Sequence, residues 1–158
     1  MRSVTGAALL CSVAASLSTA FAAPALVAPL STSEITQLAS EFSDFFLNEG
    51  YLGLWQQIEG CYKTAASLGD TKILSNCIIL DEAGKALDDN HVKATGGAYH
   101  NREWYGDSAF NDRMTKYSAA AFDDSNAYRD FWEQNKVGFG TALRKLNLSG
   151  VTDPRRFP

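Results

Sequence analysis

The sequence predicts an all-α protein, a bundle of four to five helices with one helical hairpin closed by a Cys61–Cys77 disulfide. Three observations lead to this fold class. Apolar residues recur at spacings of three and four along most of the chain, as they do on one face of a helix. No run of useful length alternates apolar and polar residues, as a half-buried strand would. The two cysteines lie symmetrically about Gly69-Asp70, a pair typical of a turn between helices.

The first residues have the parts of a cleavable secretory signal peptide. Met1-Arg2 supplies a basic start, an apolar run covers residues 6–17, and Ala20-Phe21-Ala22 supplies a small-x-small ending. The apolar run is about 12 residues long, against the roughly 20 needed to span a bilayer. We therefore expect cleavage after Ala22, no transmembrane anchor in the mature chain, and a periplasmic or secreted location.

After the predicted signal peptide (1–22), residues 23–30 read as a flexible lead-in containing two prolines. A single helical domain is expected over 31–148, followed by an irregular tail at 149–158. The first helix, about 32–48, should begin at a capping box in which the Ser31 hydroxyl and the Glu34 carboxylate satisfy backbone donors. Gly50 is expected to end this helix in a left-handed conformation.

The second and third helices, about 51–67 and 71–90, form the predicted hairpin. Each cysteine is eight residues from Gly69 and therefore about 12 Å from the turn, so the two come level. A bridge would stabilise the fold by about 3 kcal/mol, whereas the alternative is a pair of buried free thiols. Export and the even number of cysteines in the mature chain favour the bridge. The small residues expected to let the two helices approach closely are Gly60, Ala65 and Gly84.

Two more helices are expected at about 108–121 and 126–147, where aromatic and aliphatic residues recur at helical spacing. The connection before them, 96–107, is long for a compact bundle, and such loops are often functional. Aromatic rings, a guanidinium and a carboxylate together suit recognition of a small molecule or another protein. In the alternative, Trp104 and Tyr105 close the end of the bundle while the charged residues lie in water. The candidate binding residues of this loop are Tyr99, His100, Arg102, Glu103, Trp104 and Tyr105.

A metal site is a weaker hypothesis. His91 and His100 are the only histidines, and with Glu103 they could hold a divalent ion with open positions for chemistry. The spacing does not repeat the Glu-x-x-His pattern of di-metal bundles, however. The chain also lacks the sequence motifs of nucleotide, haem or serine-nucleophile sites. We therefore expect no cofactor and assign no catalytic residue.

The C-terminal residues Arg155, Arg156 and Phe157 combine basic groups with an aromatic side chain between prolines. Such a tail could dock into the groove of a partner, and the alternative is a frayed terminus.

Composition narrows the classes of function. The net charge of −4 disfavours nucleic acid as a partner, since phosphate binding depends on clustered Lys and Arg. The leading hypothesis is an exported, non-enzymatic protein that acts through contacts with a larger protein in the same compartment, such as an accessory subunit (for example of an oxidoreductase). The alternatives are a small-molecule-binding bundle and a metal-dependent enzyme using His91, His100 and Glu103.

Overall fold

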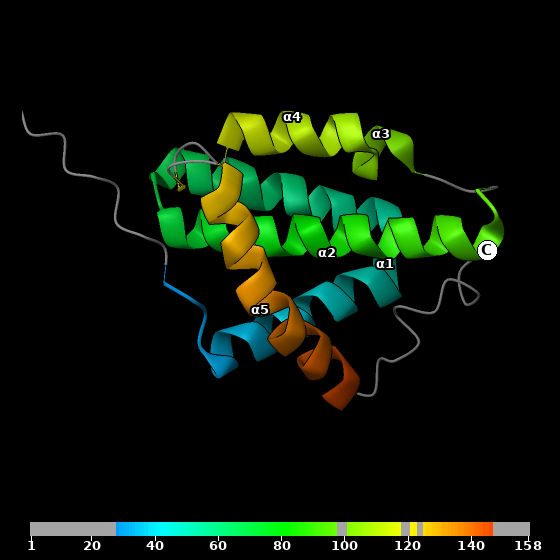
Figure 1. Ribbon diagram of the computed structural model, residues 1–158, viewed down its shortest axis with the longest axis horizontal. Helices are drawn as coiled ribbons and strands as arrows, with labels where there is room; N and C mark the ends of the chain where they lie inside the picture. The colour runs from blue at the N-terminus through cyan, green and yellow to red at the C-terminus, as the bar shows by residue number, and fades with distance from the viewer. Residues whose placement is uncertain (1–27, 98–100, 118–120, 123–124, 147–158) are drawn as a thin grey trace, which may run out of the picture.

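The computed structural model describes residues 28–97, 101–117, 121–122 and 125–146, and its regular structure there is entirely helical. The all-α prediction is thus confirmed. Figure 1 shows the helices packed around one another, with α5 crossing the hairpin formed by α1 and α2. The elements in chain order are α1 (Thr32–Leu68), α2 (Thr71–Thr95), α3 (Arg102–Tyr105), α4 (Asp107–Tyr117) and α5 (Ser125–Lys145).

Helix α1 is bent at Gly50, where the sequence predicts a break. Gly50 has φ 64° and ψ −158°, values outside the helical region, whereas the residues on either side are helical. Positive φ is strained for residues with a Cβ atom and is accessible to glycine. The two parts of α1 therefore run in different directions, and in Figure 1 only the second part lies along α2.

The hairpin and its disulfide are as predicted. Gly69 adopts a left-handed conformation and ends α1, and the Asp70 side chain caps α2 by accepting hydrogen bonds from the backbone N–H groups of Lys72 and Ile73. Cys61 and Cys77 are bonded, with their Cα atoms 5.6 Å apart. Their separation of 16 residues corresponds to about 3 kcal/mol of stabilisation through restriction of the unfolded chain.

Two expectations for the hairpin are wrong in detail. Gly60 does not face α2, since it is exposed and a Cβ atom placed there would meet nothing within 4 Å. Helix α2 continues to Thr95 rather than ending near residue 90, because no residue before Gly96 supplies a left-handed cap. The connection predicted over 96–107 begins directly after α2, and it contains the short helix α3.

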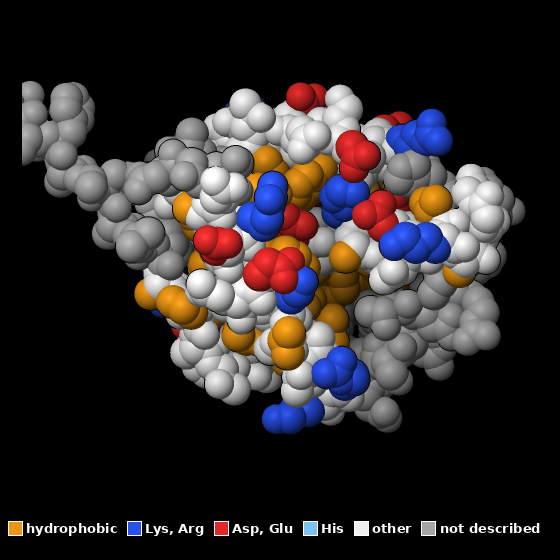
Figure 2. Space-filling view, in the orientation of Figure 1, with side chains coloured by type: hydrophobic (Ala, Val, Ile, Leu, Met, Phe, Trp, Pro, Cys, Tyr) orange, Lys and Arg blue, Asp and Glu red, His pale blue; other side chains and the backbone are white. Residues whose placement is uncertain are grey.

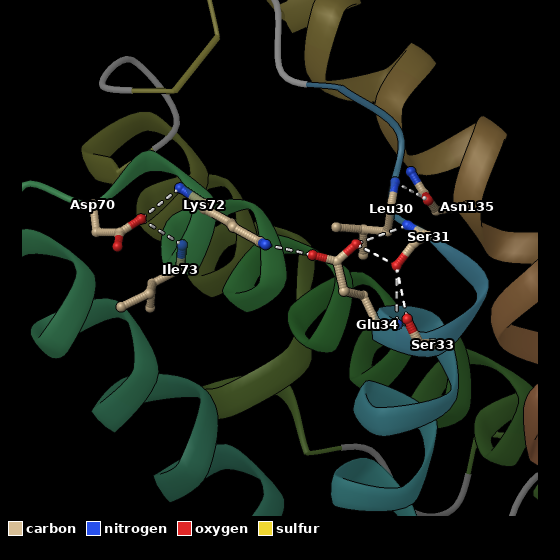
Figure 3. A network of polar contacts seen from close by, with 8 residues as sticks. All are labelled: Leu30, Ser31, Ser33, Glu34, Asp70, Lys72, Ile73 and Asn135. Atoms are coloured by element: carbon tan, nitrogen blue, oxygen red, sulfur yellow. Dashed lines mark hydrogen bonds and ion pairs between the residues drawn. The ribbon is translucent and has the colours of Figure 1, made fainter.

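The start of α1 is tied to both α2 and α5 (Figure 3). The predicted capping box is present, with Ser31 and Glu34 bonded reciprocally. The Glu34 carboxylate also pairs with Lys72 at the start of α2, and these hydrogen bonds, Lys72 first and Ser31 second, lower the pKa of Glu34 to about 2. On the other side, the buried Asn135 of α5 accepts a hydrogen bond from the Leu30 N–H at 3.1 Å.

The helices share one hydrophobic core. Phe42 of α1 meets Phe139 of α5 edge to face, with ring centroids 5.5 Å apart. Gly138 allows this close approach, because a Cβ atom there would lie 3.0 Å from Ile35. Helix α4 is attached to α2 through Lys85, whose ammonium lies 3.0 Å from the Asp107 carboxylate. Helices α1, α2, α4 and α5 thus contribute to a common interior.

In the described part of the chain, no helix is both long and apolar enough to cross a bilayer. On the face drawn in Figure 2, acidic and basic side chains are intermixed and hydrophobic atoms show between them. That face therefore lacks the continuous basic area on which phosphate binding depends.

Candidate functional site

The predicted binding loop divides into a buried and an exposed part. Tyr105 is completely buried, and its hydroxyl donates to the Tyr51 carbonyl at 3.1 Å. Burial raises its pKa, with the charge of Asp81 contributing further. Gly84 makes the space, because a Cβ atom there would lie only 2.7 Å from the Tyr105 ring. Tyr105 therefore belongs to the packed interior and is not available to a ligand in water.

Trp104 is half-buried and stacks on Trp55 of α1, with ring centroids 5.8 Å apart and planes 21° from parallel. Leu52 lies one helical turn before Trp55 on the same side of α1, and its side chain is 46% exposed. Arg102 and Glu103 are exposed beside Trp104 in sequence, and neither forms an ion pair with another described residue. We call these five residues the Trp55–Trp104 surface.

Two loop candidates, Tyr99 and His100, lie outside the described residues, as do the tail residues Arg155, Arg156 and Phe157. Their predicted roles in binding stay predictions. Of the six loop residues, the structure therefore brings Trp104 and its neighbours Arg102 and Glu103 to the surface and removes Tyr105 from it.

The metal hypothesis gains no support from the residues that the structure describes. His91 is buried and its ring meets that of Tyr51 edge to face at 5.8 Å, whereas Glu103 is exposed. Among the described residues, no group of three or more His, Cys, Asp or Glu side chains could hold a metal ion. Because His100 lies outside them, the three-residue site itself stays a prediction.

A buried charged network that was not predicted from the sequence lies under α4. The Arg113 guanidinium donates to both Asp81 oxygens, from Nε at 2.9 Å and from Nη2 at 2.8 Å. Tyr62 donates to the same carboxylate at 3.1 Å, and Arg113 Nη2 also donates to the Trp104 carbonyl at 2.7 Å. The network therefore links α1, α2, α3 and α4. One signal was available in the sequence, because Asp81 follows Cys77 by four residues on the apolar face of its helix.

Burial sets the protonation behaviour of this network. It raises the pKa of Asp81, and the hydrogen bonds and charge of Arg113 oppose that shift. Burial and the nearby Asp81 charge raise the pKa of Tyr62 well above its usual value. Asp81 has no exposed surface, so a substrate in water cannot reach its carboxylate. A general acid or base must contact the reacting atoms, and a group buried in this way does not. The network is therefore suited to holding the helices together.

A second feature that the sequence did not reveal is a pocket at the tip of the hairpin. It has a volume of about 370 Å³ and lies between the end of α1, the start of α2 and the end of α4. The Tyr117 ring forms one wall and stacks on Tyr62, with centroids 4.6 Å apart and planes 12° from parallel. Its apolar lining and three-helix construction make it suitable for a small molecule.

Comparison of the chain with family models, curated proteins and solved structures found no match.

Proposed function

We propose that this chain is an exported helical protein that acts by binding a larger protein in its own compartment, as an accessory subunit does. The observation that carries the proposal is the Trp55–Trp104 surface, a stacked pair of half-buried tryptophans with an exposed leucine one turn before Trp55 and two exposed charged residues directly before Trp104 in sequence. The Cys61–Cys77 disulfide and the predicted signal peptide support an oxidising compartment, where disulfides persist.

The chemistry of this surface suits protein recognition. Tryptophan and arginine are over-represented among the residues whose truncation weakens protein interfaces most. Leu52 and the tryptophan rings offer apolar area that a partner can remove from water, at about 25 cal/mol per Å². Arg102 and Glu103 have no ion-pair partner in the described part of the chain, so each can pair across an interface. The partner that fits presents an apolar recess bordered by a carboxylate for Arg102.

The surface is also held in place before a partner arrives. Arg113 fixes the Trp104 carbonyl, and the Trp104 N–H donates to the Asn101 carbonyl at 2.9 Å. Asn101 is bound in turn to the Asp88 carboxylate, with a 2.9 Å hydrogen bond from its side chain. Because these residues are already ordered, less conformational entropy is lost on binding, and this favours affinity for a partner.

The test is recovery of the partner from the native host. A C-terminally tagged chain, expressed with its leader and cross-linked in intact cells, is expected to recover one larger protein in stoichiometric amount. Leu52→Asp and Arg102→Glu should each reduce this recovery. The matched controls are Leu68→Asp and Lys93→Glu, since Leu68 and Lys93 are also exposed but lie elsewhere on the hairpin.

Two results would contradict the proposal. One is a chain that purifies as a monomer with no cross-linked partner. The other is a partner whose recovery falls equally with the Leu52→Asp and Leu68→Asp variants, because the Trp55–Trp104 surface would then have no particular role. Circular dichroism of each purified variant establishes that it is folded.

A further inference from the structure

The pocket at the hairpin tip has the size and walls of a small-ligand site. Its volume of about 370 Å³ lies within the range of about 300–1,000 Å³ that is usual for ligand pockets. Ala65, Ala66, Leu74 and Tyr117 supply apolar side chains, and the turn at 69–71 closes one end. The pocket is separate from the Trp55–Trp104 surface, since Trp55 and Ala66 are about 16 Å apart along α1.

The walls are fixed by the surrounding contacts. Tyr117 lies flat on Tyr62, whose hydroxyl is held by the buried Asp81 carboxylate. The helices on either side of the turn are joined by the Cys61–Cys77 bond. A pocket with such walls does not have to be ordered when a ligand enters, and this favours affinity.

The charges at the pocket point to an anionic ligand. The Asp70 carboxylate caps α2, where it accepts from two backbone N–H groups at 2.8 and 3.0 Å and offsets the positive end of the helix. Lys72 is paired with Glu34. Lys116 lies at the pocket with its ammonium 4.9 Å from the Tyr117 ring centre, and it forms no ion pair with any described residue. Lys116 is therefore the charge left for a ligand.

We propose that this pocket binds a small aromatic carboxylate. The ring of the ligand packs against Leu74 and meets the edge of the Tyr117 ring, and its carboxylate pairs with Lys116. Tyr117 is stacked on Tyr62 and the Lys116 ammonium lies over its ring, so the contact left to a ligand is edge to face, which aromatic rings also favour. One or two fused rings with a carboxylate match the pocket volume, and the lining offers few polar groups for a larger polar ligand.

The probe is 1-naphthoate, titrated into the ¹⁵N-labelled, disulfide-bonded mature protein, with neutral 1-naphthalenemethanol as its partner compound. Amide shifts are expected at 65–71, 74 and 116–117. Lys116→Met should weaken naphthoate binding by about 2- to 5-fold, which is the usual contribution of a solvent-exposed ion pair. The affinity for the neutral compound should not change. The control Lys93→Met removes an exposed lysine outside the pocket and should change neither affinity.

A second pair of variants tests the pocket itself. Ala66→Phe should fill it and weaken naphthoate binding by at least about 10-fold, whereas Ala86→Phe places the same ring at an exposed site on α2 and should have no effect. Absence of localised shifts at millimolar naphthoate, or equal affinity in the two phenylalanine variants, overturns the proposal. Leu52→Asp, which tests the partner surface, should leave naphthoate binding intact, so the two proposals can fail separately.

Discussion

Replacing Arg113 by Met should reduce the free energy of unfolding by about 3–5 kcal/mol, the usual loss when one member of a buried ion pair is removed. The structure supports this magnitude. Asp81 has no exposed surface, and both of its oxygens accept from the guanidinium, so the substitution leaves a buried carboxylate without its cation. The hydrogen bond to the Trp104 carbonyl is lost as well, which contributes about 1 kcal/mol more.

The double variant Asp81→Leu with Arg113→Met distinguishes the loss of the ion pair from the cost of leaving one charged member buried without the other. It removes the buried charge as well as its partner, so it should be more stable than Arg113→Met alone. The deficit of the single variant should also depend on pH. Burial already raises the pKa of Asp81, and loss of Arg113 raises it further, so the folded state holds this proton more tightly than the unfolded chain does. The deficit should therefore grow as the pH rises from about 4 to 7.

Urea denaturation followed by tryptophan fluorescence and circular dichroism measures these free energies. Arg129→Met is the control, because Arg129 is exposed on α5, and it should change stability by less than about 0.5 kcal/mol. Two outcomes refute the reasoning: an Arg113→Met variant within 1 kcal/mol of the parent (about the value of one hydrogen bond), or a double variant no more stable than the single one.

Three further outcomes are expected from equilibrium unfolding. Gly84→Ala should destabilise by about 1–3 kcal/mol, since its Cβ atom would lie 2.7 Å from the Tyr105 ring. Gly60→Ala should raise the free energy of unfolding by about 0.5–1 kcal/mol, because Gly60 is helical and a Cβ atom there would meet nothing within 4 Å. Equal effects of Gly84→Ala and Gly60→Ala would contradict the packing described. Burial raises the pKa of Glu82 from 4.5 to about 6, although a hydrogen bond from Tyr128 lowers it in part. The free energy of unfolding should therefore fall as the pH rises from about 4.5 to about 6. Glu82→Gln should flatten that dependence, and an unchanged profile would exclude Glu82 as its source.

The parts of the fold that could be predicted are those determined by neighbouring residues. Ser31 and Glu34 are three positions apart and form the capping box, Gly69 adopts the left-handed conformation expected at its helix end, and Gly50 interrupts the helical backbone of α1 where a break was predicted. The disulfide followed from the symmetry of two cysteines about one turn. The predicted end of α2 near residue 90 was wrong, because the helix continues to Thr95 and is capped by Gly96.

The candidate site depended on contacts between distant residues and was harder to predict. The burial of Tyr105 requires the space above Gly84, which is 21 positions earlier and on another helix. Arg113 and Asp81 are 32 positions apart, and a chain with 18 acidic residues offers no local reason to pair these two. A charged residue at an apolar position was the available clue. The pocket is formed by the ends of three helices, and no segment of the sequence contains it.

The most direct test of an exported, disulfide-closed hairpin is the intact mass of the protein isolated from its native host, alkylated without reduction. We expect a chain that begins at Ala23, carries no alkyl group on Cys61 or Cys77, and takes up two alkyl groups after reduction. A chain that retains residues 1–22, or one with both thiols alkylated before reduction, would contradict it.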